Sequence, residues 1–131
     1  KWQTDGVKTF LGIHSHGFPN LLIMSGPQGG GGQYNFIRGL ESHTDYVVWM
    51  LSTLRERGAR VVDIRKEPEV AYAEHCREAD IRTRALRDCL SYYNGEGNAQ
   101  PGSLAYYGGP KKWHELRAAA QASLTAYVFD A

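Results

Sequence analysis

Four consecutive glycines at residues 29–32 separate an apolar run from the start of a strongly patterned helix. The apolar run, residues 20–25, is short and bounded by a proline before it and a Gly-Pro pair after it, which predicts a buried strand that ends in a turn. Behind the glycines, apolar residues recur at spacings of three, four and seven, which predicts an amphipathic helix over residues 35–57. A strand, a turn, a glycine run and a helix therefore follow one another directly.

The predicted helix has matching signals at its two ends. Glu41 near its start, and Arg55 and Arg57 at its end, suit the helix dipole, and Gly58 just beyond suits a glycine C-cap. Its apolar residues form one stripe, as one face of an amphipathic helix would. The stripe consists of Ile37, Leu40, Val47, Val48, Leu51 and Leu54.

The rest of the chain alternates between strand and helix patterns. Residues 59–67 read as a strand, and Pro68 begins a polar surface helix that continues to about residue 87. Residues 91–102 are rich in Gly, Asn and Pro and predict a long loop, a kind of segment that is often functional. Three further elements are expected: a short strand at 103–107, a helix at 109–123 and a closing strand at 125–129. This order predicts a mixed α/β fold with three helices and short strands.

Composition excludes some classes of function. The chain has 131 residues, one ordinary domain's worth of sequence. Fifteen Lys and Arg against 14 Asp and Glu give no electrostatic reason to expect nucleic acid or a membrane surface as a partner. No apolar stretch approaches the roughly 20 residues that span a bilayer. Two cysteines without CxxC spacing, and no export signal, lead us to expect a reduced cytoplasmic protein.

The glycine run does not match the common phosphate-binding motifs. A P-loop requires Gly-Lys-Ser or Gly-Lys-Thr, whereas Gly32 is followed by Gln33 and Tyr34, and no GxGxxG pattern is present. A run without β-carbons in front of a helix N-terminus would still let a flat ligand approach backbone N–H groups closely. We interpret the run as the wall of a ligand site, and a flexible surface turn stays open as the alternative.

Four segments together resemble one enzyme family. They are "WQTDGVKTFLG" from residue 2, "GFPNLLIMSGPQ" from residue 17, "LESHTDYVVWM" from residue 40 and "SYYNGEG" from residue 91. In this order they resemble the C-terminal part of Baeyer–Villiger monooxygenases. These FAD- and NADPH-dependent enzymes insert an oxygen atom next to a ketone carbonyl and so form an ester or lactone. The resemblance covers essentially the whole chain.

The resemblance implies how the chain is organised. Residues 1–131 would be a single partial domain, the C-terminal part of an FAD-binding domain. Residues 1–34 would hold a linker, a strand and the glycine-rich flavin and substrate loop. Residues 35–90 would hold two helices with a strand between them, and residues 91–131 a loop, a helix and the last strand.

The resemblance also implies cofactor contacts. It places Gly26, Pro27, Asn35 and Phe36 beside the isoalloxazine ring of FAD. The helix N-terminus would then face the ring edge where reduced flavin is negatively charged. Tyr92 falls in a mobile loop that responds to NADPH in relatives, which often have tryptophan there. The alternative for Tyr92 is an aromatic side chain that packs the loop onto the core.

The substrate contacts implied by the resemblance lie in the glycine run itself. They are Gly31, Gly32, Gln33 and Tyr34, which correspond to a variable segment that borders the ketone site. Because glycines remove side-chain bulk from this wall, a bulky or cyclic ketone is our hypothesis.

Other parts of the family's machinery are expected upstream of residue 1, in a longer parent chain. These are the glycine motifs for FAD and NADPH and the catalytic arginine, so we expect no catalytic residue in this segment and no activity from it alone. The upstream dinucleotide-binding domains would be its partners, and the isolated segment is expected to self-associate. Two rival functions stay open: a related flavin N- or S-monooxygenase, and a non-catalytic binding or interaction module.

The remaining chemistry-bearing residues give weaker patterns. His14 and His16 would lie on one face of an extended segment and could begin a metal site, but no third ligand is near in the sequence, so we expect no metal. Cys76 and Cys89 are expected to be plain thiols. Three histidines are expected on polar helix faces or at interfaces: His43, His75 and His114. Three carboxylates are expected on a solvated helix face: Glu67, Glu69 and Glu74.

Overall fold

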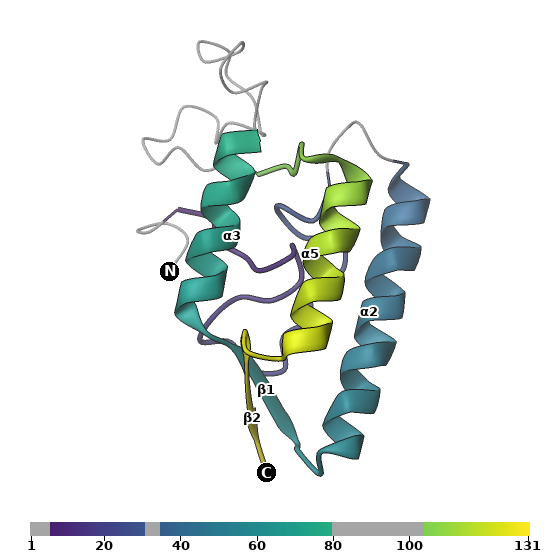
Figure 1. Cartoon of the computed structure of the whole chain (residues 1–131), viewed down its shortest axis with the longest axis vertical. Helices are drawn as coiled ribbons and strands as arrows, with labels where there is room; N and C mark the ends of the chain where they lie inside the picture. Colours follow the sequence, from purple (N-terminus) through teal and green to yellow (C-terminus); the bar gives the residue numbers. More distant parts are fainter. Residues whose placement is uncertain (1–5, 31–34, 80–103) are drawn as a thin grey trace.

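The computed structural model describes residues 6–30, 35–79 and 104–131. Within these ranges, three helices and one two-stranded antiparallel sheet form the regular structure (Figure 1). They follow the order α2, β1, α3, α5, β2 along the chain. The predicted mixed α/β class, with three helices and short strands, is confirmed. No helix in the described part of the chain is both long and apolar enough to cross a membrane.

Helix α2 (Phe36–Glu56) agrees with the predicted helix to within one residue at each end. Asn35 caps its N-terminus, because the Asn35 side-chain oxygen accepts the Arg38 N–H at 3.1 Å. At the other end, Gly58 adopts a left-handed φ of 63° and its N–H donates to the Arg55 carbonyl at 3.1 Å, which confirms the glycine C-cap. Glu41 lies beyond the first turn, which holds no acidic residue.

The apolar stripe of α2 is only partly buried. The buried residues of α2 are Ser42, His43, Tyr46, Met50 and Thr53, and Leu54 of the apolar stripe packs against the same core. Within the stripe, Ile37 is 61% exposed, Val48 58% and Leu51 56%. Periodicity shows which residues share a face, but it does not show which face the rest of this chain covers.

The two strands pair antiparallel. β1 (Val61–Ile64) and β2 (Tyr127–Asp130) run with Val61 opposite Asp130 and Ile64 opposite Tyr127. Val62 and Ile64 of β1 are both buried, as the alternation of side chains along a half-buried strand requires. Both strands were expected, and the sheet joins the end of the chain to its middle.

The other two helices were also expected. α3 (Lys66–Ala79) begins two residues after β1, and the predicted continuation to residue 87 lies outside the described residues. α5 (Gly109–Ser123) has the predicted bounds, with Pro110 in its first turn. Its residues Trp113 and Ala120 are buried.

Two predicted strands are absent from the described residues. In the segment 20–25, Asn20 and Ser25 adopt left-handed φ angles of 61° and 55°, which no regular strand accommodates. Asn20 still docks on β1, because its N–H donates to the Val62 carbonyl at 2.9 Å and its side chain accepts the Val62 N–H at 2.9 Å. Residues 104–107 form no strand either.

The centre of the core is an irregular segment rather than a helix or strand. Residues 9–15 are buried throughout, and they lie between α3 and α5 (Figure 1). Trp113 of α5 donates its indole N–H to the Leu11 carbonyl at 3.1 Å. On the other side, the Phe10 ring lies 6.0 Å from that of Tyr72 on α3, edge to face. Interior hydrogen bonds of this kind offset the cost of burying an irregular backbone.

Candidate cofactor-facing site

A tight turn at residues 26–29 occupies the position of the predicted Gly-Pro turn. The Gly29 N–H donates to the Gly26 carbonyl at 3.0 Å and closes the turn, with Pro27 in second place and Gln28 in third. Gln28 has a φ of 64°, and a positive φ at the third position is what a type II turn requires. Gly26 and Pro27 are half-buried.

Gln28 fixes this turn to several parts of the core. Its side-chain oxygen accepts the Thr9 N–H at 3.0 Å and the Thr9 hydroxyl at 2.8 Å, and its side-chain amide donates to the Val7 carbonyl at 3.2 Å. Its backbone carbonyl accepts the Tyr72 hydroxyl at 2.8 Å, and its N–H donates to the Leu104 carbonyl at 2.9 Å. No sequence pattern pointed to Gln28, because its partners are remote in the chain.

The glycines around the turn are required by contacts inside the protein. A β-carbon on Gly26 would lie 2.7 Å from the Gly12 carbonyl oxygen, and one on Gly29 would lie 2.8 Å from Cε1 of His43. A β-carbon on Gly12 would lie only 2.0 Å from the Gly29 Cα. At Gly30, by contrast, nothing lies within 4 Å. At Gly26 and Gly29 the chain itself therefore fills the space next to the missing β-carbon.

His43 of α2 connects the helix to both ends of the turn. Its Nδ1 accepts the Ser25 N–H at 3.1 Å, and its Nε2 lies 3.2 Å from the Gly29 carbonyl oxygen. The ring stacks on Trp113 of α5 at a centroid distance of 5.2 Å. Burial lowers the pKa of His43, the hydrogen bond to Gly29 raises it by a smaller amount, and the Arg117 guanidinium has the smallest effect, which lowers it. His43 is therefore buried inside the chain, between the turn and α5, rather than exposed on a polar helix face.

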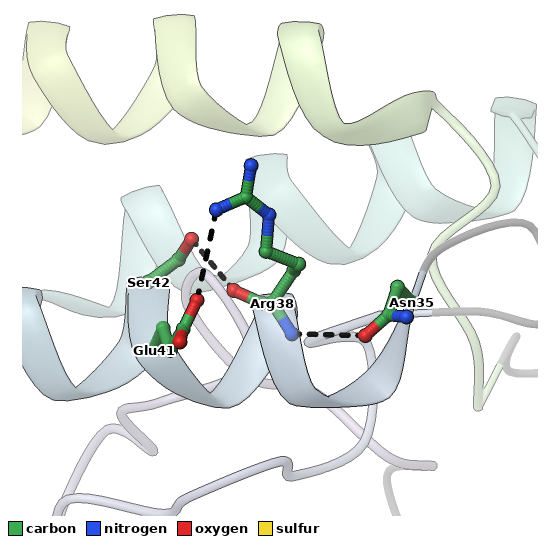
Figure 2. Close-up of polar contacts among 4 residues, drawn as sticks. All are labelled: Asn35, Arg38, Glu41 and Ser42. Carbon is green, nitrogen blue, oxygen red and sulfur yellow. Dashed lines mark hydrogen bonds and ion pairs between the residues drawn. The ribbon is translucent and has the colours of Figure 1, made fainter.

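At the N-terminus of α2, the Asn35 side chain caps the helix at the Arg38 N–H, and the Arg38 side chain lies beside Glu41 (Figure 2). Its first N–H groups, from Phe36 onward, have no acceptor within the helix, as at any helix N-terminus. The Arg38 side chain is 77% exposed and lies 3.9 Å from the Glu41 carboxylate in the next turn. With no acidic residue in the first turn, the helix dipole and Arg38 together favour a negatively charged group here.

Some of the predicted site residues lie in the described part of the chain, and others lie outside it. Asn35 and Phe36 lie at the exposed start of α2, and Gly26 and Pro27 lie in the turn that His43 anchors to the same helix. His43 is seven residues beyond Phe36, or ~10 Å along the axis at 1.5 Å per residue. The predicted substrate and NADP contacts all lie outside the described residues: Gly31, Gly32, Gln33, Tyr34 and Tyr92.

His14 and His16 do not form a common site. The buried His14 Nε2 lies 2.9 Å from the Tyr46 hydroxyl, which in turn lies 2.6 Å from the Tyr127 hydroxyl. Burial lowers the pKa of His14 to about 4, so its ring is neutral at pH 7. His16 instead donates from Nδ1 to the Ile64 carbonyl at 2.7 Å. In the ranges that the structure describes, no three His, Cys, Asp or Glu side chains are grouped as a metal site.

The prediction for one carboxylate is wrong. Glu69 is 1% exposed rather than solvated, and its side chain accepts the Ser15 hydroxyl at 3.2 Å and the His16 N–H at 2.8 Å. It lies in the first turn of α3, where a negative charge suits the helix dipole. Glu69 therefore ties Ser15 and His16 to α3. Cys76, also on α3, is a buried thiol, and Cys89 lies outside the described residues.

Comparisons with known proteins agree in sequence and in fold. No family model matches the chain. A Baeyer–Villiger monooxygenase of Streptomyces coelicolor is 30% identical over 117 residues, which cover 88% of this chain and 19% of that protein. The polycyclic ketone monooxygenase of Thermothelomyces thermophilus is 33% identical over 102 residues, which cover 76% of this chain and 15% of that protein.

A solved structure described as oxidized steroid monooxygenase bound to NADP matches this fold with a TM-score of 0.83 at 25% identity. The match covers 98% of this chain and 24% of that one. Against its curated relatives the chain spans about a fifth of their length. The chain is therefore a relative of the Baeyer–Villiger monooxygenases and corresponds to one segment of these longer proteins.

Proposed function

We propose that this chain forms part of an FAD- and NADPH-dependent monooxygenase that inserts one oxygen atom next to a ketone carbonyl, giving an ester or lactone. The observation that carries the proposal is the match to a monooxygenase structure over 98% of the chain, together with 30% sequence identity to a Baeyer–Villiger monooxygenase. In this proposal, residues 1–131 are one partial domain of a longer enzyme, and the cytoplasm is its location.

The residues at the start of α2 fit a flavin ring. A group with negative charge along one edge is stabilised by unpaired helix N–H groups, and Asn35 and Phe36 stand at that end of the helix beside the exposed Arg38. The turn that holds Gly26 and Pro27 would border the ring from the side. When bound, FAD would supply the redox chemistry that activates molecular oxygen. The chain's own part is to orient the ring and stabilise its charge with groups already in position.

The substrate proposal concerns residues 31–34. We propose that Gly31, Gly32, Gln33 and Tyr34 border the ketone and that the ketone is bulky or cyclic. The names of two relatives, a polycyclic ketone monooxygenase and a steroid monooxygenase, support this size class. Tyr92 is proposed to contact NADPH.

The exposed apolar residues of α2 fit an interface with another domain of the same parent chain. Ile37, Val48 and Leu51 are each more than half exposed and lie within one side of the helix. Exposed apolar side chains that share one side of a helix are typical of an interface. Since the relatives are about five times longer than this chain, we propose that the stripe packs on the dinucleotide-binding domains of the same parent enzyme.

The test is to purify the full-length gene product that contains this chain. Oxidised-flavin absorbance, ketone-dependent NADPH consumption and a product heavier by one oxygen atom would support the proposal. Parallel assays with an amine and a sulfide separate it from a flavin N- or S-monooxygenase, which would oxidise these and leave ketones unchanged. A colourless protein that consumes no NADPH would instead favour a binding or interaction module.

A further inference from the structure

The contacts of His43 determine the protonation of both ring nitrogens. The Ser25 backbone N–H can only donate, so Nδ1, 3.1 Å away, carries no proton and accepts. The Gly29 carbonyl can only accept, so Nε2, 3.2 Å away, carries the proton and donates. The structure therefore contains one neutral tautomer of His43, and a charged ring could not make both hydrogen bonds.

The ring fits tightly between the turn and α5. A β-carbon on Gly29 would lie 2.8 Å from Cε1 of His43, so the glycine admits the ring edge. The face of the His43 ring stacks on Trp113, and the Trp113 indole N–H donates to the Leu11 carbonyl at 3.1 Å. Since His43 is only 2% exposed, water cannot take over either of its hydrogen bonds.

We propose that His43 is a positioning residue, which holds the 26–29 turn in place for the flavin only while its ring is neutral. This inference rests on the proposed function, because Gly26 and Pro27 of that turn are the proposed flavin neighbours. Ser25 and Gly29 flank them, and His43 bonds to both. The ring thus fixes the ends of the turn against α2, the helix whose N-terminus faces the same cofactor.

Acid should release the turn. Protonation at Nδ1 would bring a second N–H against the Ser25 N–H, which removes one hydrogen bond and adds a repulsion. The loop 25–29 contributes no ionisable side chain, and the charged group that faces the ring from α5 is Arg117, which opposes protonation as burial does. The pKa of His43 therefore lies below 6.5, and release is expected as the pH falls below that value.

Three variants of the full-length, flavin-containing protein test this inference. His43→Gln offers an oxygen and an amide that can make both hydrogen bonds, but it cannot titrate. His43→Phe keeps the ring volume and the stacking on Trp113, and it removes both hydrogen bonds. His75→Gln is the matched control, because His75 lies on α3 and its Nε2 is 3.3 Å from the Tyr106 hydroxyl rather than at the turn.

The readouts are flavin release, followed by flavin fluorescence from pH 8 to pH 4.5, and the ¹⁵N spectrum of the His43 imidazole. For the wild type and His75→Gln we expect the Nε2–H tautomer of His43 and flavin affinity that falls in acid. For His43→Gln the acid-dependent loss should be smaller than in the wild type, and what remains is the loss that other buried groups such as His14 cause. For His43→Phe the affinity should be weaker at every pH, on the order of tenfold to a hundredfold.

Two results would overturn the inference. One is a charged or Nδ1–H ring at pH 7, which the spectrum detects even if His43→Phe does not fold. The other is a pH profile of His43→Gln that matches the wild type. Failure of the proposed function looks different, because the wild-type protein would then either contain no flavin or oxidise an amine or sulfide in place of a ketone, before any variant is made.

Discussion

The backbone of Gly12 lies directly against that of Gly29, so that a β-carbon on Gly12 would come within 2.0 Å of the Gly29 Cα. Gly12 also has a left-handed φ of 71°. Gly12→Ala should therefore destabilise the protein by roughly 3 kcal/mol or more, because neither backbone can yield without moving the turn. Thermal unfolding measures the loss. Gly30→Ala is the control, since its added β-carbon meets nothing within 4 Å, and equal melting of the two variants would contradict the packing described.

Glu69 provides a second test of stability. Glu69→Ala leaves the Ser15 hydroxyl and the His16 N–H without their buried acceptor, and should cost about 2–3 kcal/mol. Glu69→Gln keeps an acceptor oxygen and should cost less. The comparison is Glu67→Gln, an exposed carboxylate in the same helical turn, which should change the free energy of unfolding by less than about 0.5 kcal/mol. Urea titration of the three variants would show the order, and a Glu67→Gln loss as large as that of Glu69→Ala would contradict it.

His14 predicts how stability depends on pH. Its pKa is lowered to about 4 in the folded protein, from an ordinary value of 6.5, because it is buried. The unfolded chain therefore binds a proton at a higher pH than the folded chain, and the stability present above pH 6.5 is lost as the pH falls toward 4. The loss from this one residue is about 3 kcal/mol.

The measurement for His14 is the free energy of unfolding at several pH values, for the wild type and for His14→Phe. The variant should lose stability overall, because its contact with Tyr46 is gone, but its stability should change less between pH 7 and pH 4.5. Parallel pH profiles for the two proteins would show that His14 does not carry the effect.

The exposed stripe of α2 predicts the behaviour of the isolated segment. A chain of residues 1–131 should self-associate, because Ile37, Val48 and Leu51 would meet water without the parent enzyme. Leu51→Lys should shift it toward the monomer, as measured by light scattering over a concentration series. Ser52→Lys adds the same charge at an exposed position beside the stripe and should leave the association unchanged. Monomeric wild-type chain at high concentration would refute the prediction.

Local patterns in the sequence were sufficient to predict where most of the helices and the strands β1 and β2 lie along the chain. The Gly58 C-cap depends on neighbouring residues only, so the sequence predicted it directly. The strands β1 and β2 were likewise visible as short apolar alternations.

What the sequence did not reveal depends on distant contacts. Asn20 and Ser25 take left-handed angles that their residue types do not demand, and these angles remove the predicted strand. Glu69 is buried because its partners lie 53 and 54 residues earlier in the chain, a distance that no periodicity encodes. For α2, periodicity predicted which apolar residues share one face. Three of them, Ile37, Val48 and Leu51, are mostly exposed because the described core does not cover them.

The hydrogen bonds of Gln28 limit how the turn can move. It is bonded at once to residues Val7 and Thr9, to Leu104 and to Tyr72 of α3. A displacement of the turn would have to break or carry along all of these bonds together, since each ends on the same residue. The turn is therefore expected to move as one unit with these partners rather than residue by residue.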